Sequence, residues 1–427
     1  MTFNSLSRLG SLLCLGALAM LGACEEPSAK ASDDWPAWRG PTRDGIAASG
    51  QKLPLHWSET ENLLWRTPLP GRGHGSPTVV GDRIYLATAD QEKSSQKVLC
   101  FDRKTGQPVW ETLIHQGGLD QKGHANTSQA SASVACDGER LYINFLNNNA
   151  VHTTALDLQG KILWQTRVGD FVTHQGFASS PVVHESLVLV TADHKGGGTV
   201  AGLDRSNGHI VWQQARPKVP NYTSPAILRA AGRTQLVVAG CKLVSSFDPL
   251  TGAKLWEIAG STEECVGTAV TDGERVFSGG GYPKNHTMSV LADGSGKVAW
   301  ENSSRVYVPT MIAEGGYLYA VMDSGVAVCW KSATGEEQWK ERLGGDFFSS
   351  PVRVDGRMYA TNLRGTTFVF DARPNEFKLL AQNQLGDEVY ATPAICGNRI
   401  YMRIAKTGDV RKEYLVCIGA KESDVSP

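Results

Sequence analysis

Residues 76–86 read Ser-Pro-Thr-Val-Val-Gly-Asp-Arg-Ile-Tyr-Leu, and residues 101–110 read Phe-Asp-Arg-Lys-Thr-Gly-Gln-Pro-Val-Trp. Together they form the first of eight copies of one pattern: a small residue and Pro, an apolar pair, a Gly-containing turn, an apolar and aromatic strand, then Asp, Gly and Trp. The eighth copy stops soon after Cys417 and lacks its Trp-bearing strand, but a matching segment at residues 63–67 precedes the first copy. A closed ring explains this arrangement, whereas an open stack of repeats does not.

The strand after the Gly turn recurs as a short β-branched and aromatic segment, for example at residues 140–143 and 357–360. Such segments, bounded by Gly, Asp and Asn, are typical of β-strands. The copies follow one another at intervals of roughly 40 to 50 residues, which fits the four strands of a propeller blade. We therefore predict an all-β fold over residues 61–420. It is an eight-bladed β-propeller of four-stranded antiparallel blades, closed where the N-terminal strand joins the last blade.

The Asp, Gly and Trp of each copy have structural roles in this prediction. Asp102 can accept backbone N–H groups at the start of a tight turn, and Gly106 can adopt a positive φ. Trp110 follows on the outer strand, where its ring would fill the gap between neighbouring blades. The same position holds Trp65, Trp164, Trp212, Trp256, Trp300 and Trp339 in other copies, and Leu379 in the seventh.

The N-terminus has the features of an export signal. Arg8 precedes an apolar run at residues 9–21, which ends in Leu-Gly-Ala-Cys at residues 21–24 and resembles a bacterial lipobox. That resemblance implies cleavage before Cys24 and lipid attachment to its thiol; the alternative is an ordinary secretory signal. We expect residues 1–23 to be a lipoprotein signal peptide, residues 24–60 a tether and lead-in, and residues 421–427 a tail.

Composition limits the classes of function. The formal net charge is -1 and charged residues make up 20% of the chain, so no nucleic-acid footprint is visible. Three of the cysteines, Cys100, Cys329 and Cys417, share one strand position of the repeat, which favours small buried hydrophobic residues over disulfides.

The repeats resemble the pyrroloquinoline-quinone-type repeat. The motif Asp-x-x-Thr-Gly-x-x-x-Trp is matched at residues 102–110 and 248–256, and at 204–212 with Asn207 in place of Thr. The resemblance covers about residues 62–420 and points to two groups, the quinoprotein alcohol dehydrogenases and the outer-membrane assembly lipoprotein BamB. Residues 35–45 also resemble the lead-in of propeller proteins from planctomycete-type bacteria.

A quinoprotein dehydrogenase would, by this resemblance, hold pyrroloquinoline quinone with an adjacent Cys-Cys pair, a calcium site of Glu, Asn and Asp, and a catalytic Asp. Adjacent cysteines, a haem-binding Cys-x-x-Cys-His motif, a P-loop, a Gly-x-Ser-x-Gly elbow and His-Glu-x-x-His are all missing from the sequence. We therefore predict no catalytic residues, and the quinone is implied by kinship alone.

Polar and aromatic side chains gather just before the inner strands. In a propeller these linkers surround one mouth of the axial channel, where ligands and peptides bind, and aromatic residues and Arg are frequent in binding hot spots. We predict a recognition surface made by His74, His174, Asn221, Tyr222, Glu264, Arg305, Tyr307, Phe348 and Tyr390. The alternative is a solvated rim whose aromatic rings pack locally.

Three histidines in the same linkers, His74, His124 and His174, raise the question of a zinc or copper site. A histidine at a polar channel mouth is more often an unliganded hydrogen-bonding residue, so we predict no metal.

The sequence as a whole favours a lipid-anchored binding or assembly scaffold, exported to the periplasm and attached to the outer membrane. Its expected partners are envelope proteins or peptides, with membrane contact through the lipid anchor only and no nucleic acid. The alternatives are a pyrroloquinoline-quinone-dependent oxidoreductase and a carbohydrate-binding propeller.

Overall fold

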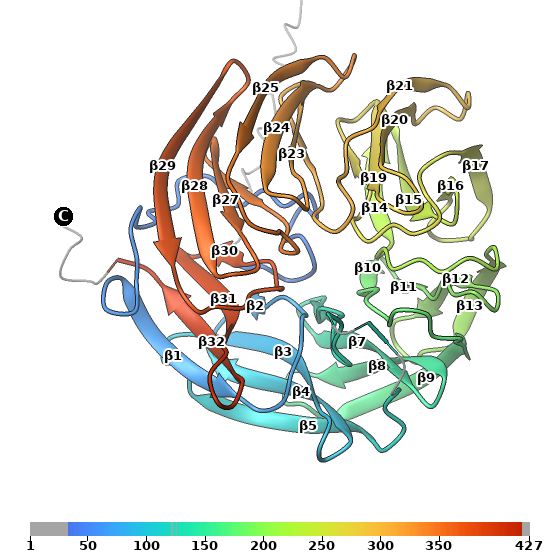
Figure 1. Ribbon diagram of the computed structural model, residues 1–427. Coiled ribbons are helices and arrows are strands. Elements are labelled where there is room, and N and C mark those ends of the chain that lie inside the picture. The colour runs from blue at the N-terminus through green and yellow to red at the C-terminus, as the bar shows by residue number, and fades with distance from the viewer. Residues whose placement is uncertain (1–32, 121–122, 125, 421–427) are drawn as a thin grey trace, which may run out of the picture. The chain divides into compact units, whose positions relative to one another are not determined.

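The computed structural model describes residues 33–120, 123–124 and 126–420, which form eight four-stranded antiparallel sheets arranged as the blades of a propeller (Figure 1). This confirms the predicted fold class. Within the described part of the chain, no helix is long and apolar enough to cross a lipid bilayer. The predicted signal peptide at residues 1–23, the lipidation residue Cys24 and the tail at residues 421–427 lie outside the described residues.

The blades follow one another in chain order, each from its inner to its outer strand. Blade 1 consists of β2 (Thr78–Val80), β3 (Arg83–Asp90), β4 (Ser95–Asp102) and β5 (Pro108–Gln116), and blade 2 of β6 (Ala135–Cys136), β7 (Arg140–Asn147), β8 (Ala150–Asp157) and β9 (Ile162–Asp170). Blade 3 consists of β10 (Val182–His184), β11 (Leu187–Thr191), β12 (Thr199–Asp204) and β13 (Ile210–Ala215). Blade 4 consists of β14 (Ala226–Ala230), β15 (Arg233–Gly240), β16 (Leu243–Phe247) and β17 (Lys254–Ala259). Blade 5 consists of β18 (Val270–Thr271), β19 (Arg275–Gly280), β20 (His286–Leu291) and β21 (Val298–Asn302). Blade 6 consists of β22 (Ile312–Glu314), β23 (Tyr317–Val321), β24 (Val326–Lys331) and β25 (Glu337–Arg342). Blade 7 consists of β26 (Val352–Val354), β27 (Arg357–Thr361), β28 (Thr366–Arg373) and β29 (Glu376–Gln384).

Blade 8 closes the ring with strands from both ends of the propeller. It contains β30 (Ala394–Cys396), β31 (Arg399–Lys406), β32 (Lys412–Ile418) and, as its outer strand, β1 (Leu63–Leu69). Figure 1 shows the blue β1 beside the red β32. Trp65 lies opposite Cys417 in the antiparallel register, so the predicted closure is confirmed.

The outer-strand tryptophans pack against the next blade, as predicted. The rings come so close to the turn glycines that a Cβ on Gly252 would lie 2.4 Å from Cε3 of Trp212. Trp256 departs from the pattern because its indole Nε1 donates to Gln235 of its own blade at 2.6 Å. In five of the others the indole N–H donates to a carbonyl oxygen of the next blade, joining Trp110 to Leu158, Trp164 to Arg205, Trp212 to Pro249, Trp300 to Ser332 and Trp339 to Arg373.

The strand positions of the cysteines also agree with the sequence analysis. All seven cysteines of the described residues are free and buried. Five of them pack with the apolar side chains of the blades and serve as small hydrophobic residues, for example Cys417 beside Leu415 and Val416 in the core of blade 8. The other two have polar contacts, since Cys241 Sγ donates to the carbonyl oxygen of Val219 and Cys265 Sγ lies 2.7 Å from Ser261 Oγ.

The lead-in, residues 33–57, packs against the propeller. Trp35 is buried and exchanges two backbone hydrogen bonds with Val79 of β2. Arg39 is fully buried, and its guanidinium donates to the carbonyl oxygens of Met311 and Pro351, ahead of blades 6 and 7. Further contacts reach blades 2, 3, 5 and 7, so this non-repeating segment ties together blades that are far apart in sequence.

Candidate functional site

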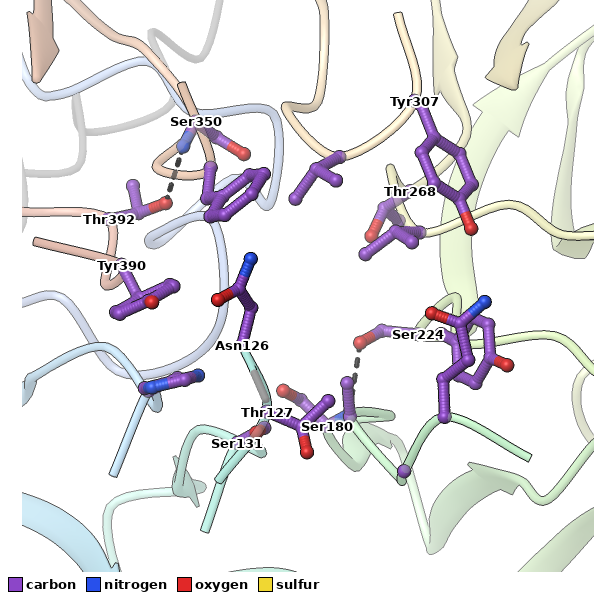
Figure 2. A pocket seen from close by; sticks show the side chains of 18 of the residues that line it. Asn126, Thr127, Ser131, Ser180, Ser224, Thr268, Tyr307, Ser350, Tyr390 and Thr392 are labelled. Carbon is purple, nitrogen blue, oxygen red and sulfur yellow. Dashed lines mark hydrogen bonds between the residues drawn. The ribbon is translucent and has the colours of Figure 1, made fainter. Parts of the chain in front are cut away.

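A central cavity of about 480 Å³ lies where the eight blades meet. Every blade contributes residues from the linker that precedes its inner strand, and the lead-in contributes Trp38. Figure 2 shows the labelled side chains Asn126, Ser180, Tyr307 and Tyr390 around this opening. The cavity is therefore an axial pocket, and its position agrees with the mouth that the sequence analysis predicted.

The narrow part of the pocket is surrounded by what we call the hydroxyl collar, the Ser or Thr that begins each copy of the repeat. In five copies a Pro follows this residue and holds it in an extended conformation. Seven of the eight hydroxyls accept a backbone N–H from the equivalent residue of the preceding blade. The collar consists of Ser76, Ser133, Ser180, Ser224, Thr268, Thr310, Ser350 and Thr392.

Seven hydrogen bonds of 2.9 to 3.1 Å run around the collar, one at every junction of neighbouring blades except that between blades 4 and 5. The last of them leads from Thr392 N–H of blade 8 back to Ser76 Oγ of blade 1. At the remaining position, Thr268 Oγ1 accepts the indole N–H of Trp38 at 3.0 Å. The collar therefore joins the inner ends of the blades and attaches the lead-in to them.

One side of the pocket wall holds a buried carboxylate among hydrogen-bond donors. Glu264 accepts the hydroxyl of Tyr307 at 3.0 Å and the amide of Gln175 at 2.9 Å, and its second oxygen lies 3.2 Å from His174 Nδ1. His174 Nδ1 is also 3.2 Å from the hydroxyl of Tyr222. Burial raises the pKa of Glu264, although the hydrogen bond from Tyr307 opposes this effect. Burial also raises the pKa of Tyr222 and Tyr307, so both hydroxyls remain neutral.

The opposite side of the wall is an aromatic stack. His74 lies on Tyr390 with ring centroids 3.9 Å apart, Phe348 lies on the same tyrosine at 5.6 Å, and the Arg72 guanidinium is 5.9 Å from its centroid. Burial, with the positive charges of nearby arginines, holds the pKa of His74 well below its ordinary value. Its imidazole is therefore neutral and acts as a flat stacking surface.

Arg305 and Asp323 supply the charges that line the pocket. The guanidinium of Arg305 lies 5.1 Å from the ring centroid of Tyr307 and 3.9 Å from an oxygen of Asp323. The Asp323 carboxylate accepts the backbone N–H of Tyr307 at 2.8 Å and of Val308 at 3.3 Å. Burial raises the pKa of Asp323, which those hydrogen bonds partly offset.

The structure places the nine predicted residues in three ways. Six of them line the pocket, namely His74, Tyr222, Arg305, Tyr307, Phe348 and Tyr390. His174, which is exposed, and Glu264, which is buried, contact lining residues but do not line the pocket themselves. Asn221 lies away from the pocket, where its side chain binds Asp193, Thr223 and the backbone of Ala239 and Cys265.

The sequence analysis did not single out Trp38, Asp323 or the hydroxyl collar. The collar had a readable signal, because the position before the inner strand is Ser or Thr in all eight copies and never Ala or Gly. Trp38 and Asp323 carried no such signal.

The three histidines considered as metal ligands have separate surroundings. His74 stacks on Tyr390, His124 Nδ1 accepts the backbone N–H of Asn126, and His174 contacts Glu264. In residues 33–120, 123–124 and 126–420, no three His, Cys, Asp or Glu side chains are grouped to hold a metal ion.

The lining residues also lack the set that the resemblance to quinoprotein dehydrogenases implies. No cysteine lines the pocket, and Asp323 is the one carboxylate among the described lining residues. Because its oxygens already accept two backbone N–H groups, Asp323 is not arranged as part of a Glu, Asn and Asp calcium site. The residues present do not fit the quinone and its calcium ion.

Fold and pocket together define an eight-bladed β-propeller of pyrroloquinoline-quinone-type repeats with a hydroxyl-rich and aromatic axial pocket. The chain belongs to the family described as outer membrane protein assembly factor BamB, whose model matches residues 41–152, 94–341 and 284–416. The overlapping matches reflect the internal repeat.

Three known proteins illustrate the breadth of this similarity. The chain is 27% identical over 352 residues to the outer membrane protein assembly factor BamB of Burkholderia pseudomallei, covering 77% of this chain and 81% of that protein. It is 26% identical over 343 residues to tetrathionate hydrolase of Acidithiobacillus ferrooxidans, covering 71% of this chain and 66% of that protein. The solved structure of a quinohemoprotein alcohol dehydrogenase from Comamonas testosteroni shares the fold, with a TM-score of 0.65 over 92% of this chain and 82% of that chain at 13% identity.

Proposed function

We propose that this protein is a cell-envelope scaffold that binds a segment of a partner protein at the mouth of its axial pocket. The observation that carries the proposal is the convergence of Tyr222, Tyr307, Phe348, Tyr390 and Arg305 on one opening. Rigid aromatic rings bury apolar area at a low entropic cost and, together with Arg, dominate the energetics of protein interfaces. Membership of a family named for the assembly of outer membrane proteins supports a protein as the partner.

The proposal includes export and lipid attachment at Cys24. The support is the apolar run at residues 9–21 followed by the lipobox-like residues 21–24. Replacing Cys24→Ser should release the protein from the membrane fraction and abolish incorporation of labelled palmitate. Labelling of the variant equal to that of the wild type would rule out this anchor.

Site-specific photocrosslinking in the native envelope tests the recognition surface. A photoreactive amino acid is placed at Phe348 or Tyr390, and at the exposed outer-strand position Val211 as a control, which is 56% exposed. We expect covalent adducts of discrete mass from the mouth positions and none of the same mass from Val211. Identical adducts from all three positions, or none from the mouth, would contradict the proposal.

A further inference from the structure

The hydroxyl collar has hydrogen-bonding capacity that the contacts between blades leave unused. In each of the seven links the hydroxyl oxygen is the acceptor, so its hydrogen remains available to another acceptor. Thr268 likewise accepts from Trp38. Within the part of the chain that the structure describes, none of these hydroxyls donates to a protein atom.

These hydroxyls are buried but reach the pocket. Each collar residue is at most 7% exposed, and all of them except Thr310 line the cavity. Figure 2 shows Ser180, Ser224, Ser350 and Thr392 at the edge of one opening. A buried hydroxyl without an acceptor costs about 1–3 kcal/mol, and at the seven lining positions the contents of the cavity are in a position to supply the acceptor.

The geometry limits the chemistry of those contents. Seven hydroxyl donors that line one cavity match a group that carries several acceptor oxygens close together. Neutral dipoles oriented in this way stabilise negative charge, as oxyanion holes and backbone nests do. Of the charges near the pocket, Arg305 favours an anion, whereas Asp323 and the buried Glu264 oppose one, so the attraction for an anion has to come mainly from the collar hydroxyls.

We propose that the hydroxyl collar binds a compact oxyanion, namely a carboxylate, sulfate or sulfonate group, on the axis of the pocket. The proposal rests on the pocket being the recognition site and names the chemical group that it recognises. Two sources can present this group: a free small anion, or the terminal carboxylate of a partner segment whose side chains contact the aromatic mouth.

A matched pair of substitutions separates recognition from the structural role of the collar. Thr392 and Thr310 each accept one backbone N–H from the preceding blade, at 2.9 and 3.0 Å, but Thr392 lines the pocket and Thr310 does not. Thr392→Val and Thr310→Val therefore remove the same inter-blade bond, whereas Thr392→Val also removes a donor from the pocket.

The experiment measures binding by isothermal titration with sulfate, with an Ala-Ala-Ala peptide bearing a free C-terminal carboxylate, and with the amide of that peptide. We expect the wild type and Thr310→Val to bind alike and Thr392→Val to bind about ten-fold more weakly, the effect of one hydrogen bond to a charged group. Sulfate binding identifies a free anion as the source, and binding of the carboxylate peptide but not its amide identifies a chain terminus.

Crystals soaked in selenate provide a direct readout that does not depend on the partner. The proposal requires an anomalous peak on the axis within hydrogen-bonding distance of the collar. Water alone at that place, or equal losses in Thr310→Val and Thr392→Val, would overturn it. Photocrosslinks at the mouth without anion binding would refute the collar proposal alone, whereas anion binding without crosslinks would refute the scaffold proposal.

Discussion

The closure of the ring rests on a contact between its last and first blades. Trp65 lies on β1 in blade 8, and Gly106 lies in the turn after β4 in blade 1. Gly106 has a φ of 72°, and a Cβ at this position would lie 2.5 Å from Cε3 of Trp65. Gly106→Ala therefore carries a backbone cost of about 1 kcal/mol and an overpacking cost of about 1–3 kcal/mol. Together these predict a loss of about 2–4 kcal/mol in the free energy of unfolding.

A double-mutant cycle isolates the overpacking term. In a Trp65→Ala background the clash with the ring is gone, so Gly106→Ala should cost the backbone term and the remaining contact of the Cβ with Thr67 Oγ1, at 2.8 Å. The coupling energy should be about 1–3 kcal/mol, measured by urea unfolding followed by circular dichroism. Gly81→Ala is the control because its φ is 53° but nothing lies within 4 Å of the added Cβ. Its cost should be equal in both backgrounds. Additive effects for Gly106→Ala, within about 0.5 kcal/mol, would refute this account of closure.

Two further perturbations follow from buried side chains. Trp256→Ala should lower stability by about 3–5 kcal/mol, because the indole is 7% exposed and bonded to Gln235; an unchanged melting temperature would contradict its packing role. Burial, and then His152, lowers the pKa of His115 from 6.5 to about 4. Since the unfolded chain binds this proton more readily, stability that is present above about pH 6.5 is lost as the pH falls towards about 4. His115→Gln should lose less stability than the wild type between about pH 7 and about pH 4.5 in urea titrations. The exposed His209→Gln control should follow the wild type, and an equal loss in both variants would exclude His115 as a source.

The ring was predictable because its evidence is repeated along the chain. A truncated eighth copy and a matching N-terminal strand constrain topology more strongly than any local propensity does. The packing of Trp against the next blade could be predicted in the same way. A large apolar ring on the outer strand, four residues after each turn glycine, can be buried in the gap between its own blade and the next. Trp256 shows the limit of this reasoning, because its indole N–H binds a side chain of its own blade.

The pocket was predictable in position but only in part by residue. Linkers before inner strands surround the axis in any propeller, so most of the predicted aromatic residues do line the pocket. The direction of each side chain depends on partners remote in sequence. Asn221 turns towards Asp193, 28 positions away, and Trp38 and Arg39 bind residues 230 and 312 positions away. The contacts of Trp38 and Arg39 have no periodic signal in the sequence, because the lead-in occurs once.

Collar hydroxyls that line the pocket have two roles, to join neighbouring blades through the oxygen and to offer the hydrogen to a ligand. Thr310 has the first role without the second. Holding neighbouring blades together requires an acceptor oxygen, which explains Ser or Thr in place of Ala or Gly at every copy. That role is complete at Thr310, which accepts the N–H of Thr268 without lining the pocket. At the seven lining positions the same oxygen also carries a hydrogen into a cavity whose protein walls offer it no acceptor. Blade packing therefore accounts for the oxygen but not for what its hydrogen binds, and the collar proposal assigns that hydrogen to an oxygen of the ligand.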